Sequence, residues 1–284
     1  MTMVLRLAAI AVSILATPVV AETKVIANVG LVNSEAARHD PVADRLIVTN
    51  LGPRGPGNDG FVSLFSPDGT LIQLKWIEGG ANGVELHDPL GVFIKGDLVY
   101  VADTATVRTF DRVSGRPVAN VPVPGAVRLN DLTVDDKGTV YVTDSGNDDT
   151  AGALFRITAK GKVSTFAARN PALERPNGIA IMADGNIVHG GRGVNLVIRS
   201  PRGAIIREIT LPTGRFDGII PLTDGSLLVA SQDGKNVYRV PLAGKPVVVA
   251  SDFAIPAAIG LDARRNRLVV PQIVAATLTL VDLP

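Results

Sequence analysis

Apolar and polar residues alternate along most of the chain in short runs separated by glycine-containing turns. The clearest example runs from Arg128 to Asp144, RLNDLTVDDKGTVYVTD. Leu132 and Val134 alternate with polar residues, a turn follows at residues 136–138, and a second alternating run extends to Thr143. Alternation with a period of two on both sides of a glycine turn predicts a β-hairpin.

The same hairpin pattern occurs six times. The aligned copies begin at Glu35, Leu90, Asn130, Asn177, Asp217 and Ala257, at intervals of 55, 40, 47, 40 and 40 residues. Most copies are followed by two further strand-like runs, so each unit holds four short strands. Four strands in about 40–50 residues is the size of a propeller blade. The pattern therefore predicts an all-β fold, a six-bladed β-propeller.

The two ends of the chain are expected to close this propeller. Residues 23–29 are strand-like but belong to no complete unit, and the last unit is short. Pairing of this N-terminal strand with residues 276–281 would complete the final blade and remove its free edge. We expect a single propeller domain over residues 22–284.

The first 21 residues differ from the rest of the chain. Arg6 precedes an apolar run from Leu7 to Ala16, and Val19 and Ala21 are small residues at positions −3 and −1 of a cleavage site. This pattern predicts a secretory signal peptide over residues 1–21 and a periplasmic or secreted mature protein. The chain has no cysteine, so its stability would come from packing rather than disulfides.

Charge narrows the range of partners. The formal net charge is +1, and no basic stripe or acidic run is visible. Nucleic acid is therefore not an expected partner, and neither is a membrane once the signal is cleaved. We expect a monomer that binds a small molecule.

The first residue of each copy suggests a metal site. In a propeller the first strand of every blade lines the central channel, so these six side chains should meet near one level. Glu35, Asn130, Asn177 and Asp217 would supply oxygen atoms, while Leu90 and Ala257 would close the ring without ligands. Oxygen donors with two negative charges suit one Ca²⁺, and the lack of His or Cys disfavours zinc. Alternatively, these groups could cap strand ends and bind channel waters.

These positions carry a resemblance to a known family. Glu35, the Arg128–Asp131 segment, Pro176-Asn177-Gly178 and Phe216-Asp217-Gly218 resemble the gluconolactonase, regucalcin and luciferin-regenerating-enzyme group of six-bladed propellers. The resemblance implies that the matching Glu, Asn, Asn and Asp hold a catalytic Ca²⁺. It also implies hydrolysis of a lactone or related ester.

The resemblance also suggests roles for individual residues. Asp217 would activate the attacking water or attack directly, with Asp131 as a second candidate for proton transfer. Arg128 and Asn130 would orient the substrate, and His87 could reach the channel mouth from a loop. Paraoxonase-like enzymes, more distant relatives, place a catalytic histidine where this chain has Leu90, so that mechanism does not apply.

Two other functions stay open at the level of sequence. The protein could be a non-catalytic module that binds a small ligand through the same channel and metal. It could also be an interaction scaffold with its function on the loops of one face. A propeller fold hosts all three functions, so the fold does not choose among them.

Overall fold

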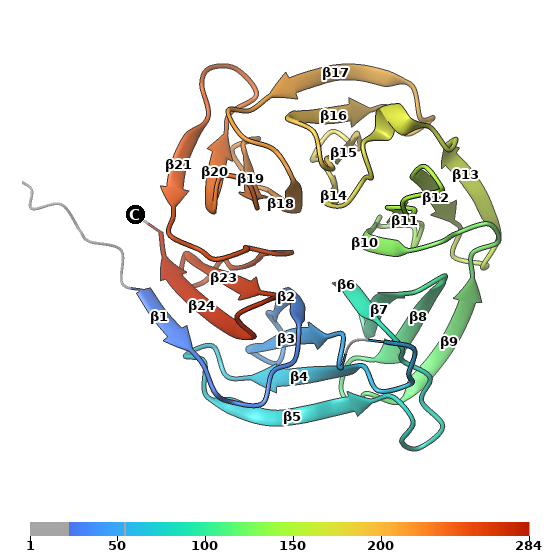
Figure 1. Cartoon of the computed structure of the whole chain (residues 1–284), viewed down its shortest axis with the longest axis vertical. Coiled ribbons are helices and arrows are strands. Elements are labelled where there is room, and N and C mark those ends of the chain that lie inside the picture. Colours follow the sequence, from blue (N-terminus) through green and yellow to red (C-terminus); the bar gives the residue numbers. More distant parts are fainter. Residues whose placement is uncertain (1–22, 54, 284) are drawn as a thin grey trace, which may run out of the picture.

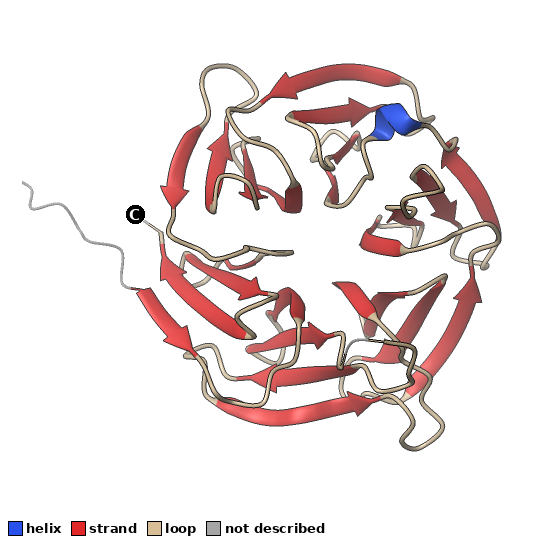
Figure 2. Cartoon of the chain, in the orientation of Figure 1, coloured by secondary structure: helices blue, strands red, loops and turns tan. Residues whose placement is uncertain are grey.

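The computed structural model describes residues 23–53 and 55–283, which form six four-stranded antiparallel sheets arranged around a central axis (Figure 1). The predicted six-bladed propeller is thereby confirmed. Strands account for nearly all regular structure in the part described (Figure 2), and its helical segment η1 (Pro171–Leu173) is a single 3₁₀ turn. The predicted signal peptide lies outside the described residues. Among the described residues, no helix combines the length and the apolar character needed to cross a membrane.

Each sheet is built from strands that follow one another along the chain, moving outward from the axis. The innermost strands are β2 (Ser34–Asp40), β6 (Pro89–Lys95), β10 (Leu129–Val134), β14 (Ile179–Ile181), β18 (Phe216–Pro221) and β22 (Gly260–Asp262). The second strands are β3 (Arg45–Asn50), β7 (Leu98–Asp103), β11 (Val140–Asp144), β15 (Ile187–His189), β19 (Leu227–Ser231) and β23 (Arg267–Gln272).

The remaining strands complete the outer half of each sheet. The third strands are β4 (Phe61–Phe65), β8 (Thr106–Asp111), β12 (Ala153–Ile157), β16 (Asn195–Arg199), β20 (Asn236–Val240) and β24 (Thr277–Asp282). The outermost strands are β5 (Leu71–Glu78), β9 (Pro117–Pro122), β13 (Val163–Ala167), β17 (Ile205–Thr210), β21 (Val247–Ala250) and β1 (Thr23–Ile26).

The last blade closes as the sequence predicts. β1 pairs antiparallel with β24, with Thr23 opposite Val281 and Ile26 opposite Leu278. The sixth sheet thus takes its outermost strand from the start of the described chain and its other three from the end (Figure 1). This pairing covers the edge of β24, which would otherwise be open to association with other strands.

The hydrophobic core lies between neighbouring sheets. In one such cluster, Ile47 and Val62 of the first blade pack with Val99 and Phe110 of the second. Burial falls from the axis outward: every residue of β10 is buried, whereas β9 and β17 are mostly exposed. Apolar side chains on both faces of the inner strands explain why each blade needs its neighbours for stability.

Candidate functional site

A polar cavity lies at the end of the central channel where the innermost strands begin. Its volume is about 460 Å³, and all four predicted metal ligands line it, together with Arg128. Glu35, Asn130 and Asp217 are buried, and Asn177 is partly buried. Residues up to 182 positions apart in sequence therefore contribute to one cavity, as the repeat alignment predicts. We call the six aligned positions (Glu35, Leu90, Asn130, Asn177, Asp217 and Ala257) the inner ring.

Local irregularities in the innermost strands help to set the direction of the inner-ring side chains. In blades one, two, three and five, the pairing register shifts at the inner-ring residue, for example between Leu129 and Leu132 and between Phe216 and Ile219. Such bulges leave residues outside the regular ladder and turn their side chains. The sequence pattern of alternating residues could locate the hairpins but not these bulges.

Threonines on the second strands stabilise two of the bulges and link them to the next blade. Thr143 Oγ1 accepts a hydrogen bond from the Asp131 amide at 3.0 Å and donates to the Asn177 carbonyl at 2.6 Å. Thr49 does the same between the Ala36 amide and the Leu90 carbonyl. Each threonine thus fixes one inner-ring position relative to its neighbour.

Close backbone packing explains why glycine follows Asn177. A Cβ atom at Gly178 would lie 1.6 Å from the Asp217 carbonyl oxygen. Without a side chain at this position, the fourth and fifth blades approach closely enough for Asn177 to reach Asp217. The Asn177 Nδ2 group donates to Asp217 Oδ2 at 3.2 Å.

Hydrogen bonds in the cavity use the nitrogen atoms of the amides and leave oxygen atoms free. Asn130 Nδ2 donates to Ser145 Oγ at 2.9 Å, and Gln232 Nε2 donates to Asp217 Oδ2 at 2.7 Å. Asn177 Oδ1 and Asp217 Oδ1 are buried and have no hydrogen-bond partner among the described residues. Buried polar atoms without partners are rare because leaving them unsatisfied costs about 1–3 kcal/mol each.

The electrostatics of the cavity also favour the binding of a cation. Burial raises the pKa of Glu35 to about 7, an effect that Arg128 opposes and Asp131 reinforces. Burial raises the pKa of Asp217 well above its usual value, and the charges of Glu35 and Asp131 raise it further. Two buried carboxylates that disfavour each other's ionisation and two unpartnered oxygens fit a hard divalent cation bound by oxygen ligands.

Asp131 occupies a different environment from the inner ring. It is fully buried, accepts a hydrogen bond from the Leu132 amide, and pairs with Arg38 at 3.6 Å. Burial raises the pKa of Asp131, and the Arg38 charge opposes this. Asp131 is not among the residues that line the polar cavity. Its part in proton transfer stays a prediction.

His87 is held in its loop by two hydrogen bonds. Its Nδ1 lies 2.6 Å from the Gly57 carbonyl, and its amide donates to Asp103 at 3.0 Å. It does not appear among the residues lining the polar cavity, whereas its neighbour Asp88 does. A substrate contact by His87 therefore stays a prediction without support from the cavity geometry.

Two further layers of the cavity follow the blade repeat, and of their members sequence reasoning named only Arg128. One consists of residues two positions before the inner ring, which we call the outer ring: Asn33, Asp88, Arg128, Arg175, Arg215 and Ile255. The first five of these line the cavity. The other layer consists of residues one or two positions after the second strands: Leu51, Ser145, Gly191, Gln232 and Ile273. The constant offset of the outer ring from the inner ring would have been the signal for the first layer.

Buried aspartates hold two of the outer-ring loops. Asp144, the last residue of β11, accepts hydrogen bonds from the amides of Val127 and Arg128 and pairs with Arg169 at 2.6 Å. Asp103 accepts in the same way from the amides before the second blade, including that of Asp88 at 2.7 Å. These two buried carboxylates do not line the cavity themselves, but they fix the backbone of Arg128 and Asp88, which do line it.

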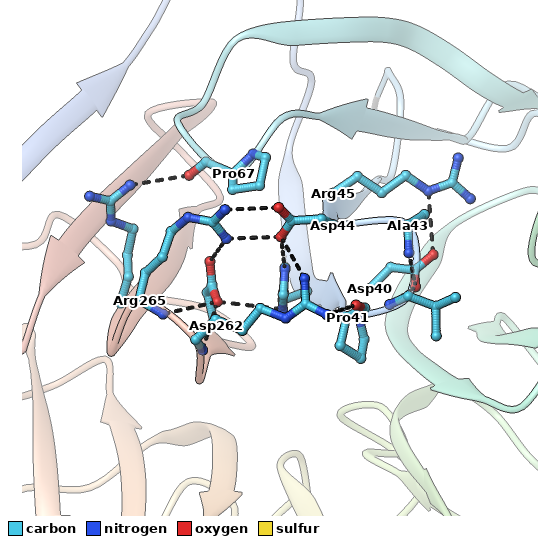
Figure 3. A network of polar contacts seen from close by, with 12 residues as sticks. Asp40, Pro41, Ala43, Asp44, Arg45, Pro67, Asp262 and Arg265 are labelled. Carbon is cyan, nitrogen blue, oxygen red and sulfur yellow. Dashed lines mark hydrogen bonds and ion pairs between the residues drawn. The ribbon is translucent and has the colours of Figure 1, made fainter.

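A second group of acidic and histidine side chains lies at the other end of the innermost strands. His39, Asp44 and Asp262 have ligand atoms within 4.8 Å of one another. Arg265 already forms two 2.8 Å bonds to Asp44 and one 2.7 Å bond to Asp262 (Figure 3). Hydrogen bonds from Arg265 and His39 lower the pKa of Asp44. We call this cluster of His39, Asp44, Asp262 and Arg265 the clasp; it joins the first and sixth blades and is neutralised by arginine.

Comparisons with known proteins agree with this fold. A search of curated proteins found no match to this sequence. Among solved structures, a gluconolactonase from Xanthomonas campestris, XC5397, is 17% identical with a TM-score of 0.69, covering 89% of this chain and 87% of that one. A luciferin-regenerating enzyme is 15% identical with a TM-score of 0.69, covering 92% and 95%.

A third structure shows that similar folds carry other activities. Virginiamycin B lyase from Staphylococcus aureus is 13% identical with a TM-score of 0.63, covering 93% of this chain and 100% of that one. Identities this low establish the fold and no more. The sequence itself supplies the stronger evidence, because the model of the SMP-30/gluconolactonase/LRE-like region matches residues 66–248. The chain belongs to the SMP-30/gluconolactonase/LRE-like family.

Proposed function

We propose that the chain is a Ca²⁺-dependent hydrolase of lactones or related esters, with Glu35, Asn130, Asn177 and Asp217 holding the ion in the polar cavity. The observation that carries the proposal is the pair of buried, unpartnered oxygens, Asn177 Oδ1 and Asp217 Oδ1, beside a second buried carboxylate. Family membership and the likeness to a gluconolactonase support the reaction class. The ion, when bound, would supply Lewis-acid polarisation of the substrate carbonyl.

The Asp217 carboxylate would accept the proton of the attacking water. Asn177 and Gln232 both donate to Oδ2, which fixes the plane of the carboxylate and leaves Oδ1 without a partner. Oδ1 would face the ion, and because each carboxylate oxygen has more than one lone pair, the same fixed group can also accept a hydrogen bond from the attacking water and act as a general base. Water then adds to the ester carbonyl, the ring C–O bond breaks, and the leaving alkoxide takes up a proton to give a hydroxy acid. Direct attack by Asp217 is the alternative that the same geometry permits.

Arg128 and Asn130 would orient the substrate. Ser145 accepts from Asn130 Nδ2 and itself donates to the Pro176 carbonyl at 2.7 Å, so the side-chain oxygen of Asn130 is the group left for the ligand. Burial raises the pKa of both Glu35 and Asp88, and the Arg128 guanidinium lies close enough to oppose both shifts. It is therefore placed to donate hydrogen bonds to a substrate oxygen near the inner ring.

The start of the sequence and its composition suggest the compartment in which the protein works. The predicted signal peptide over residues 1–21 and the absence of cysteine support export, and we propose the periplasm. We further propose that the mature protein acts as a monomer on a small molecule.

A panel of sugar lactones and aryl esters tests the function. We expect hydrolysis of at least one lactone in the presence of Ca²⁺, loss of that activity after treatment with a chelator, and recovery when Ca²⁺ is returned. Ca²⁺-dependent ligand binding without turnover of any compound would favour the non-catalytic binding module. Turnover that is unchanged after complete removal of the ion would contradict the proposed mechanism.

A further inference from the structure

The outer ring divides the cavity mouth into two halves of different charge. Blades three, four and five contribute Arg128, Arg175 and Arg215 at equivalent positions, whereas blades one and two contribute Asn33 and Asp88. Because blades three to five are consecutive, their innermost strands β10, β14 and β18 lie next to one another around the axis (Figure 1). The three arginines therefore share one side of the mouth.

A fourth arginine connects the loops of this side. Arg192 also lines the cavity, in the loop after β15. Its amide donates to the Glu174 carbonyl at 2.7 Å, and its carbonyl accepts from the Arg215 amide at 3.3 Å. The loops that carry Arg175, Arg192 and Arg215 are thus bonded directly to each other. We call these three residues together with Arg128 the arginine side.

The backbone at two of these arginines adopts an uncommon conformation. Arg175 and Arg215 both have φ of 55°, in the left-handed region that glycine and asparagine enter more readily. This conformation is strained for a long side chain, and such residues cluster at binding and active sites. Asn33, at the equivalent position of the first blade, has φ of 51°. Three of the six outer-ring positions, in blades one, four and five, thus share this conformation, and two of them carry arginine.

These guanidinium groups are available to a ligand. Arg128, Arg192 and Arg215 are exposed to solvent. Arg175 pairs with Asp148 at 2.7 Å, but Asp148 is 95% exposed, and Arg215 lies 3.8 Å from a half-exposed Asp233. Ion pairs this exposed contribute little, so a ligand could replace them at small cost.

The charges lining the cavity do not cancel once the inner ring holds a cation. Among the described residues that line the cavity, four arginines face three carboxylates, and two of these carboxylates, Glu35 and Asp217, belong to the proposed ion site. Asp88 is then the one carboxylate of this described lining left opposite the arginine side. A net positive half of a partly enclosed cavity attracts anions and favours bidentate contacts to carboxylate or phosphate.

We propose that the arginine side binds an anionic substituent of the substrate, so that the preferred substrates are lactones that carry a free carboxylate or phosphate group. This inference rests on the proposed function for the lactone ring, whereas the anion contact depends on the arginines alone. A carboxylate or phosphate at the end of a sugar-sized lactone would lie against Arg192 and Arg215 while the ring carbonyl lies at the inner ring.

Matched pairs of lactones test the proposal. D-Glucono-1,4-lactone and D-glucaro-1,4-lactone differ only in a hydroxymethyl group against a carboxylate, and D-glucono-1,5-lactone and its 6-phosphate form the phosphate pair. The full-length mature protein with Ca²⁺ is assayed for kcat/KM on each pair. Calorimetric binding of D-gluconate and D-glucarate gives a second readout that needs no turnover.

The variant Arg192→Gln/Arg215→Gln removes two of the contacts, and Arg192→Gln alone serves if the double variant does not fold. Arg202→Gln is the matched control, since Arg202 is exposed in the turn between β16 and β17 and does not line the cavity. We expect a preference of about tenfold or more for the anionic member of at least one pair, because hydrogen bonds between charged groups are worth at least that factor. The preference should persist in Arg202→Gln and disappear in the double variant.

Equal treatment of neutral and anionic compounds by the wild type would overturn the proposal, as would a preference that survives in the double variant. A preference in the carboxylate pair alone, or in the phosphate pair alone, would support it and identify the anion. If no lactone is hydrolysed but D-glucarate binding still depends on the two arginines, the hydrolase function fails while the anion site stands.

Discussion

The two ends of the central channel hold two acidic clusters that differ in how their charge is balanced. At the clasp, Arg265 contacts both Asp44 and Asp262 within 2.8 Å, and the pKa of Asp44 is lowered by its partners (Figure 3). At the inner ring, no arginine of the described residues forms an ion pair with Glu35 or Asp217, and burial raises both pKa values. The carboxylates of the clasp, which arginine neutralises, hold two blades together, whereas we propose that those of the inner ring bind a cation as a ligand.

The largest expected effect is on kcat, and it should distinguish the inner ring from the clasp. Asp217→Asn keeps the shape of the side chain but removes the charge and the proton acceptor. We expect kcat on the best lactone to fall by about 10²–10³-fold, the usual contribution of a general base or a charged site group. The control Asp262→Asn changes the clasp instead and should leave kcat close to that of the wild type. Equal losses of kcat in both variants would contradict the assignment of the catalytic role to the inner ring rather than to the clasp.

The next effect concerns stability. Asp262→Ala takes away the buried partner of Arg265 and the acceptor for the amides of Arg264 and Arg265. We expect the free energy of unfolding to fall by about 2–3 kcal/mol in urea titrations with a chelator present. The extra stability gained on adding Ca²⁺ should be the same as in the wild type. If that gain vanished, the ion would belong to the clasp.

The buried His189 should make the stability of the protein depend on pH. Burial lowers the pKa of His189 to about 3, and the Arg199 guanidinium, which donates to its Nε2 at 2.9 Å, adds to the effect. The unfolded chain binds this proton near pH 6.5, so the contribution is complete above that pH and is lost as the pH falls toward 3. We expect stability to drop by about 2 kcal/mol between pH 7 and pH 5 through this residue.

His189→Gln is the matched variant for that measurement, because its side-chain oxygen can accept from Arg199 without titrating. Chemical unfolding at a series of pH values should show a smaller acid loss for the variant than for the wild type. An identical pH dependence of the two proteins would mean that His189 is not the group that titrates.

The fold and the inner ring could be predicted from the sequence because both follow from the repeated hairpin pattern. Six aligned hairpins place Glu35, Asn130, Asn177 and Asp217 at one level, and the cavity brings these four together. The short strand at the start of the described chain could likewise be assigned to β24, since a propeller leaves one unpaired edge.

Other parts of the site were not accessible from the hairpin pattern. Arg175 and Arg215 lie at a fixed offset from the inner ring, but they are outside the alternating segment. No pattern in their loop sequences predicts the direction of their side chains. Gln232 donates to Asp217 at the bulged start of β18, and the alternating pattern does not predict that bulge. The clasp joins Asp44 to Arg265 across 221 residues, a contact set by closure of the propeller and not by local sequence.

Calorimetric titration of chelator-stripped protein with Ca²⁺ tests the central claim most directly. The inner ring predicts one Ca²⁺ bound per chain, with binding abolished in Glu35→Gln and in Asp217→Asn and retained in Asp262→Asn. An absence of binding by the wild type, or an affinity that is the same in Asp217→Asn, would contradict the assignment of the cavity as a calcium site.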